Sequence, residues 1–229
     1  MSRCGRSLPS AAVVVAAAVL FAVGCTGSPP EILHVDVTLA LRFDPSSASR
    51  YEALEVYVAV RDDDGDDDVA LLQIVHDDRQ LVWEFAREEW LTTTYGVDRW
   101  IGSSDLRMAD DAPVPRGAYR ALVWDVAQQQ ATADFFVTHR PVDLSDVVFP
   151  TFERRAGRVT VVSPAEALLR GYNRSGELIV NERVPPGPLA DEIARRLDQA
   201  GMRVYLELDH ETGATLQYGP VDWDATGRS

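Results

Sequence analysis

The sequence contains no lysine, so all 22 of its basic residues are arginine. Asp and Glu outnumber them with 36 residues, which gives a formal net charge of −14. A basic surface that neutralises phosphate groups is therefore missing. This argues against nucleic acid as a partner, and equally against attachment to anionic lipid headgroups by charge.

Cysteine is nearly absent, since only Cys4 and Cys25 occur. If the chain is cut before Cys25, as argued below, one cysteine remains. The mature protein is then predicted to have no disulfide, no thiol nucleophile and no cysteine metal site. With 229 residues, 46% of them apolar, the chain is long enough to be held by a hydrophobic core instead.

Catalytic signatures are also missing. No serine lies in a Gly-x-Ser-x-Gly turn, and no glycine-rich phosphate or dinucleotide motif occurs. Glu88 and Glu89 are adjacent, so on a strand they would point to opposite faces. The histidines lack the short spacing of zinc ligands, so a zinc site would need distant segments to meet; they are His34, His76, His139 and His210.

The N-terminal segment has the order of a secretory signal. Arg3 and Arg6 precede the apolar stretch 11–23, and small residues lead to Cys25. A bilayer-spanning helix needs about 20 apolar residues, so this stretch is too short to be a transmembrane anchor. A signal peptide over residues 1–24 is predicted.

The end of this segment, Leu20-Phe21-Ala22-Val23-Gly24-Cys25, resembles the lipobox of bacterial lipoproteins. The resemblance implies that Cys25 carries a covalent lipid with palmitate-type acyl chains, and that it becomes the first mature residue. Ala22 replaces the more usual leucine. Thr26 follows where an inner-membrane retention aspartate is often found, which favours an outer membrane if the cell has one. The alternative is a plain signal peptide with a chance cysteine.

Lipidation at Cys25 predicts a cell-envelope protein attached to a membrane through acyl chains, several of which anchor stably where one would not. Residues 25–30 form the lipidated cysteine and a tether rich in Gly, Ser and Pro. Removing Arg3 and Arg6 leaves 36 acidic residues against 20 Arg, a charge of −16. Acyl chains, not charge, would hold such a protein to its membrane.

Residues 31–139 alternate between apolar and polar side chains with period two, which indicates half-buried strands. Turn residues separate most of these segments. Seven short strands of this kind favour an antiparallel β-sandwich. The expected strands cover 33–43, 54–60, 69–75, 81–85, 100–101, 119–126 and 131–137.

Within this region, Pro115-Arg116-Gly117-Ala118-Tyr119 resembles the opening of a late strand in immunoglobulin-like and fibronectin-type domains. In those domains a tyrosine near this position closes a corner between the two sheets. The resemblance implies an immunoglobulin-like β-sandwich. No cysteine pair or fixed tryptophan spacing accompanies it.

Residues 140–229 are predicted to form a small α+β unit, either a second domain or a cap on the sandwich. A helix near 188–200 is indicated by Leu189, Ile193 and Leu197, with Pro188 before it and Gly201 after it. Two pairs spaced i,i+4, Asp191 with Arg195 and Glu192 with Arg196, would support it. The other expected elements are a strand at 158–162 and strands near 204–208 and 215–218. Residues 163–166 have the spacing of a helix capping box, which leaves 167–172 open between a helix and part of a hairpin that turns at 172–178. The hairpin is favoured.

The run 62–68 contains six aspartates around Gly65. Calcium takes six to eight oxygen ligands, so Asp62, Asp64, Asp66 and Asp68 are a candidate calcium site. The loop at 77–78 would add ligands if it folds to the same end. The spacing does not fit an EF-hand, and the alternative is a solvated turn whose charge discourages strand aggregation.

Aromatic residues concentrate between residues 83 and 124, among threonines. Trp90, Tyr95 and Trp100 are a candidate binding surface for carbohydrate or a protein partner, since aromatics on a rigid sandwich make good platforms. The alternative is that tryptophans such as Trp83 and Trp124 pack into or over the core.

Together these patterns predict a membrane-anchored envelope lipoprotein that acts as a non-enzymatic binding or assembly module. Its partner would be an envelope protein or polysaccharide, with no cofactor other than possible calcium. Two alternatives stay open: an envelope-polymer hydrolase and a calcium-dependent adhesin. A large pocket that gathers carboxylates or a histidine would favour the hydrolase, and an exposed aromatic patch would favour binding.

Overall fold

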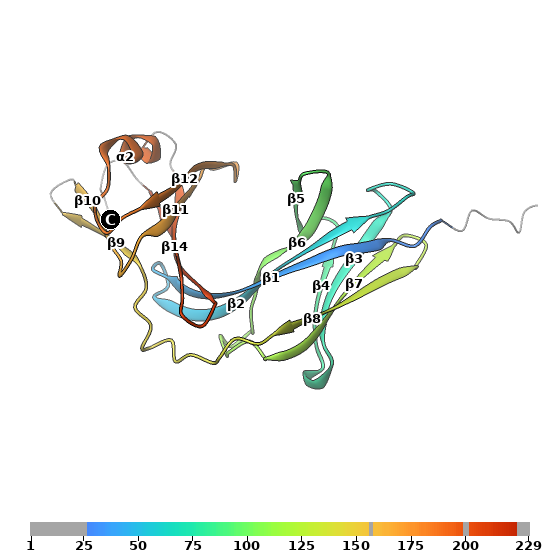
Figure 1. Ribbon diagram of the computed structural model, residues 1–229. Helices are drawn as coiled ribbons and strands as arrows, with labels where there is room; N and C mark the ends of the chain where they lie inside the picture. The colour runs from blue at the N-terminus through green and yellow to red at the C-terminus, as the bar shows by residue number, and fades with distance from the viewer. Residues whose placement is uncertain (1–26, 156–157, 199–201, 224–229) are drawn as a thin grey trace, which may run out of the picture.

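The computed structural model describes residues 27–155, 158–198 and 202–223. The fold is mainly β, with three sheets, one of them a curled half-barrel, and α2 is the only α-helix in these ranges (Figure 1). The elements are β1 (Glu31–Asp44), β2 (Ser49–Arg61), β3 (Val69–His76), the 3₁₀ turn η1 (Asp77–Arg79), β4 (Leu81–Ala86), β5 (Leu91–Tyr95), β6 (Asp98–Leu106), β7 (Gly117–Asp125), β8 (Gln130–Val137), β9 (Thr151–Arg155), β10 (Arg158–Val162), β11 (Ala167–Tyr172), β12 (Leu178–Val184), β13 (Gly187–Pro188), α2 (Asp191–Asp198), β14 (Arg203–Asp209) and β15 (Thr215–Asp222). No helix in the described ranges is long and apolar enough to cross a membrane.

The first eight strands form two groups. β1, β2, β6 and β5 lie in that order in one sheet, and β4, β3, β7 and β8 form a second. All seven expected strands are confirmed. β5 was not expected, because its sequence Leu-Thr-Thr-Thr-Tyr does not alternate and all five residues are exposed. Pairing with β6, not burial, holds this strand in place.

The C-terminal strands join the first sheet. Its full order is β12-β11-β14-β15-β1-β2-β6-β5, so one curled sheet contains both the first and the last strand of the described residues. β15 pairs with β1 in parallel, from Ala40 opposite Thr215 to Phe43 opposite Tyr218. β1 is long enough for this because its 14 residues extend about 3.3 Å each. Figure 1 shows β1 and β2 running between the two halves of the molecule.

Two buried hydrophobic clusters stabilise the fold. One lies between the two groups of N-terminal strands, and the second between the C-terminal strands and α2. Tyr119 is 1% exposed in the first cluster and its hydroxyl donates a hydrogen bond of 2.7 Å to the Pro115 carbonyl. This hydrogen bond ties β7 to the segment that precedes it.

One buried ion pair crosses the first core. Glu52 on β2 is 1% exposed and accepts two hydrogen bonds from the Arg116 guanidinium, at 2.7 and 2.8 Å. It also accepts one from the Val114 amide at 2.9 Å. Arg116 donates further to the His139 carbonyl at 2.9 Å. This clamp joins β2 to the segment before β7 and to the segment after β8.

The predicted helix exists but is shorter than expected, and neither predicted i,i+4 ion pair forms. α2 begins at Asp191, because Gly187–Pro188 pairs with β10 as β13; residues 199–201 lie outside the described ranges. Arg195 donates to the Asp191 backbone carbonyl, and Arg196 pairs with Glu182 on β12 at 2.8 Å. The neighbouring strand offers Arg196 a better-placed carboxylate than its own helix does.

The remaining C-terminal predictions are confirmed in part. The strands at β10, β14 and β15 and the hairpin turn after β11 are confirmed. The capping box at 163–166 is wrong, since no helix follows it and β11 begins at Ala167. Pairing on both sides, with β12 and with β14, outweighs the local helix-capping preference of this segment.

Candidate functional site

The acidic run forms the loop between β2 and β3. Its backbone turns at Gly65, which has a φ of +112°, and Asp62 Oδ1 accepts a hydrogen bond of 3.0 Å from the Asp64 amide. The Asp68 carbonyl accepts one of 2.9 Å from the Val126 amide. The loop is thereby held against the turn that connects β7 to β8.

Three carboxylates converge beside this loop. Asp62, Asp68 and Asp125 each place one oxygen within 4.8 Å of the others. Asp125 is fully buried at the end of β7, and Gln129 donates to it from its amide nitrogen at 2.7 Å and its Nε2 at 3.1 Å. Asp62 Oδ2 is shielded from solvent and has no hydrogen-bond partner among the described residues. Such a set of hard oxygen atoms can hold a divalent cation.

Without a cation, repulsion among the three carboxylates of this cluster lowers the stability of the folded state. Loss of solvent around Asp68, followed by repulsion from Asp62 and Asp125, raises the pKa of the Asp68 carboxyl. Arg87 offsets this shift only in part. Arg87 itself contacts the neighbouring residue Asp67, at 2.9 Å between Nη1 and Oδ1.

Only two of the four predicted calcium ligands, Asp62 and Asp68, belong to the converging set. Asp66 lies 4.0 Å from an Arg99 nitrogen, and Asp64 Oδ2 accepts from the Ser28 amide at 2.5 Å. The 77–78 loop does not fold to this end, because it follows β3 at that strand's far end. There Asp77 pairs with Arg120 at 2.7 Å.

The sequence reasoning missed Asp125. Asp125 lies inside the expected strand 119–126, and no spacing links it to the acidic run. The register of β7 on β3 brings it there, since Asp125 lies opposite Val69, the residue after Asp68. Its one signal was an aspartate directly after the apolar run of β7.

The three predicted aromatic residues do not form one surface. Trp90 is 6% exposed and packs in the first core, so it was wrongly predicted to be an exposed contact residue. Tyr95 is 80% exposed, and with Trp100 it lines a hollow of about 360 Å³. Trp90 has the same threonine-rich neighbourhood in the sequence as Tyr95 and Trp100, but it lies just before β5 and its side chain packs into the core.

The other walls of this hollow come from β1, β2 and β5. Asp36 and Tyr57 are paired residues of β1 and β2, and Thr93 lies opposite Trp100 in the β5–β6 pair. The His34 ring meets the Trp100 ring edge-on, with centroids 5.8 Å apart. Thr93 is one of the threonines that lie among the predicted aromatic residues in the sequence. Sequence reasoning missed Asp36 and Tyr57, since only the pairing of β2 with β6 brings the β1–β2 strands beside Trp100. We call the five lining residues the aromatic hollow: Asp36, Tyr57, Thr93, Tyr95 and Trp100.

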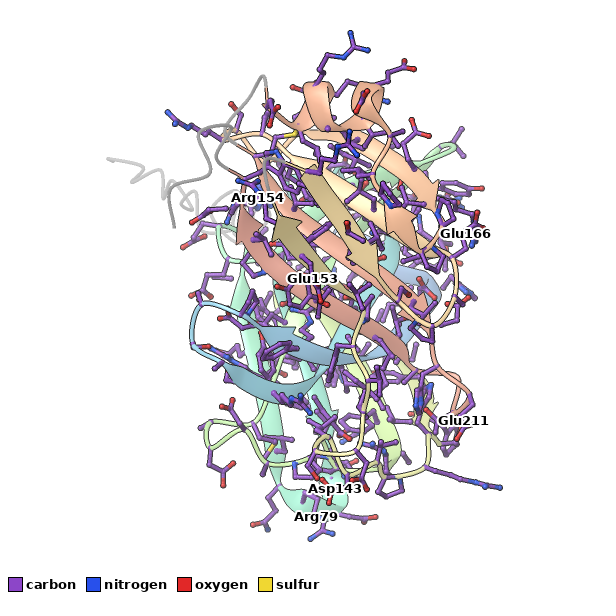
Figure 2. The ribbon with its side chains drawn as sticks, turned by 90° about the vertical axis from the view of Figure 1, so that its left-hand side faces the viewer. Arg79, Asp143, Glu153, Arg154, Glu166 and Glu211 are labelled. Carbon is purple, nitrogen blue, oxygen red and sulfur yellow. The ribbon has the colours of Figure 1, made fainter. Side chains whose placement is uncertain are left out.

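A further hollow, of about 1050 Å³, lies between the segment 138–148 and the β14–β15 turn. Figure 2 labels Glu211 in this turn. His210 lines it, but its Nδ1 lies 2.8 Å from the Thr212 hydroxyl, a contact within the turn. The nearby carboxylates of Asp209 and Glu211 form no hydrogen bond with His210 among the described residues. These contacts are those of a turn and not of a nucleophile with its base.

The other histidines are dispersed. His76 contacts the Arg116 carbonyl at 3.1 Å, and His139 contacts the Gly213 carbonyl at 3.2 Å. Within the described ranges, the Asp62, Asp68 and Asp125 cluster alone gathers three potential metal ligands. Cys25 lies outside the described residues.

No family model matches the chain, and no curated protein matches it by sequence. Two solved structures are distantly similar. Tp47, the 47-kilodalton lipoprotein of Treponema pallidum, aligns with 12% identity and a TM-score of 0.37, over 85% of this chain and 52% of that one. Dimeric latent PorU from Porphyromonas gingivalis aligns with 14% identity and a TM-score of 0.32, over 85% of this chain and 20% of that one. The chain thus spans about half of Tp47 and a fifth of PorU.

Proposed function

We propose that this protein is a lipid-anchored component of the cell envelope that binds carbohydrate without transforming it. The observation that carries this proposal is the aromatic hollow. Three aromatic rings, those of Tyr57, Tyr95 and Trp100, border an open and almost wholly apolar space of about 360 Å³, and Asp36 and Thr93 complete its lining. Apolar ring faces together with a few polar groups suit the alternating faces and hydroxyls of a sugar.

We further propose that residues 31–139 form an immunoglobulin-like sandwich that carries this hollow, with residues 140–229 as an attached α+β unit. The strand orders support it: β1-β2-β6-β5 corresponds to the A-B-E-D sheet of that fold, and β3-β7-β8 to its C-F-G sheet. The Tyr119 hydrogen bond to Pro115 lies where the tyrosine corner would be.

If the aromatic hollow binds carbohydrate, its ring side chains should be needed for that binding. Titration of the full chain in detergent with cellohexaose should change its tryptophan fluorescence, and Trp100→Ala should weaken that binding at least about tenfold. Phe136→Ala is a matched control, since Phe136 is 67% exposed on the other sheet. Equal losses in both variants, or no glycan binding at all, would overturn the proposal. Capture of an envelope protein that depends on Trp100 would instead assign the hollow to a protein partner.

A second candidate function, calcium-dependent binding, is favoured by the unpartnered Asp62 Oδ2 beside Asp68 and buried Asp125. Calcium sites of extracellular modules have dissociation constants of about 0.1–1 mM. Calcium at 10 mM should then raise the melting temperature by about 3–10 °C, because the ion binds the folded state. Magnesium should raise it less, since Mg²⁺ demands a tighter octahedral geometry. Absence of a calcium shift would exclude this candidate.

The substitution Asp68→Asn tests the same cluster, and the direction of its effect on stability follows from the pKa shift. The raised pKa of Asp68 means that its ionised form opposes folding, so stability rises as pH falls through the folded-state pKa. Without calcium, Asp68→Asn should therefore make the protein more stable at pH 7, and it should abolish the calcium shift. Asp63→Asn is the control in the same loop, since Asp63 lies outside the converging set. A calcium shift that survives Asp68→Asn would exclude the cluster as the site.

A further inference from the structure

A polar hollow of about 380 Å³ lies on the curled eight-stranded sheet, beside the aromatic hollow. The two share Tyr57, which lines both. Strand alternation collects its other side chains on one face: Arg170 and Tyr172 on β11 lie opposite Tyr205 and Arg203 on β14. Strands from both halves of the sequence contribute, so the hollow exists only because β15 joins β1.

Its charge is unlike that of the chain around it. Three arginines, Arg42, Arg170 and Arg203, line it against two carboxylates, Glu55 and Glu207. The lining therefore carries a net positive charge in a chain whose formal charge is −14. Asp105, which lies outside the lining, also pairs with Arg42, so the unbalanced positive charge of the hollow is that of Arg203. An unbalanced arginine at the wall of a hollow favours an anion there.

The three arginines are paired to different degrees. Arg42, 9% exposed, is fixed by Glu55 at 2.8 Å and by Asp105 at 3.1 Å. Arg170 has one carboxylate partner, Glu207, at 3.1 Å. Arg203 is exposed and has no hydrogen bond or ion pair within the described ranges. The Nε atoms of Arg42 and Arg170 are buried without a hydrogen-bond partner. The arginines at this hollow therefore have more N–H donors than the carboxylates of the lining accept.

Hydroxyl groups complete the lining. Tyr57, Tyr172 and Tyr205 border the hollow, and the Tyr172 and Tyr205 rings meet edge-on with centroids 5.7 Å apart. Burial raises the pKa of the Tyr57 and Tyr205 hydroxyls, so both stay protonated and able to donate at neutral pH. Phenols and guanidiniums together suit a ligand with both hydroxyl groups and a negative charge.

We propose that this hollow binds an acidic sugar, with the carboxylate of a uronic acid at Arg203 and Arg170 and the sugar ring among the three tyrosines. A volume of about 380 Å³ lies in the range of small-molecule sites. The inference rests on the proposed carbohydrate function and extends it, because an acidic unit here and a neutral unit in the aromatic hollow would share Tyr57. It assigns the protein to acidic envelope polysaccharide as the ligand class.

Calorimetric titration of the full chain in detergent, at low ionic strength, with D-glucuronate and with D-glucose tests this. Glucuronate should bind and glucose should bind at least tenfold more weakly, since the two differ in the carboxylate. Arg203→Gln should weaken glucuronate binding at least tenfold without altering the fold, because Arg203 is exposed. The matched control is Arg79→Gln in η1, an exposed arginine at the bottom of Figure 2.

The remaining outcomes separate the two proposals. Trp100→Ala should remove cellohexaose binding but leave glucuronate binding intact, and Arg203→Gln should do the reverse. Equal affinity for glucose, or binding unchanged by Arg203→Gln, would overturn the acidic-sugar site while leaving the aromatic hollow standing. Acetate binding as tightly as glucuronate would reduce the hollow to a general anion site and overturn its assignment to a sugar.

Discussion

Glu52→Ala is expected to lower the free energy of unfolding by about 3 kcal/mol, the low end for a buried pair, because it leaves the partly buried Arg116 guanidinium without its counter-charge. Glu52 accepts hydrogen bonds at 2.7 and 2.8 Å from Arg116 and at 2.9 Å from the Val114 amide. All three donors lose their acceptor at once. Chemical denaturation followed by fluorescence measures the effect as a lower midpoint with an unchanged slope.

Two further variants separate charge from hydrogen bonding at this position. Glu52→Gln keeps one acceptor oxygen but not the charge, so its loss should be smaller than that of alanine. Glu88→Ala removes an exposed carboxylate and should change stability by no more than about 0.5 kcal/mol. If Glu52→Ala proves as mild as Glu88→Ala, the buried clamp does not contribute to stability.

Cys25→Ser is expected to abolish lipid attachment completely, since serine lacks the sulfur that would carry the diacylglycerol. The lipoprotein resemblance implies that modification precedes cleavage, so the variant should accumulate as an uncut precursor. Palmitate labelling, together with the difference in mass on a gel, measures both effects. Cys4→Ser is the matched control, because residue 4 lies in the segment proposed to be removed.

The mature charge of −16, from 36 acidic residues and 20 arginines, makes this a strict test. Charge would not keep the mature domain on an anionic membrane once the acyl chains are gone. A Cys25→Ser variant that is cut normally and released as a soluble protein would contradict the lipoprotein proposal. It would instead identify a plain signal peptide.

The strands were predictable wherever one face of a strand is buried. In β1, Val35, Val37, Leu39 and Leu41 alternate with polar residues, and period two leaves little choice of structure. β5 was missed because both of its faces are exposed. The helix was placed near its true position by the spacing of Ile193 and Leu197, but its start was wrong because β10 takes Gly187–Pro188 as a strand.

The candidate sites were predictable only in part, since each combines a local signal with a distant partner. The acidic run predicted Asp62 and Asp68 correctly, and strand register added Asp125. The other two predicted ligands have different partners, since Asp64 accepts from the Ser28 amide and Asp66 lies near Arg99. Tyr95 and Trp100 were found from composition. Asp36 and Tyr57 were not, because they lie about 40 or more residues earlier in the chain.

The sequence by itself therefore determined the proposed export and lipid signal, the acidic character and the strands with a regular apolar alternation, all of which arise from neighbouring residues. Only the tertiary structure decided the parallel pairing of β15 with β1, and with it the polar hollow that contains Arg42, Arg170 and Arg203. Arg42 and Arg170, which are 128 positions apart, meet there because backbone hydrogen bonds join their strands into one sheet. Backbone hydrogen bonds form between any residue types, so the side-chain sequence does not reveal this pairing.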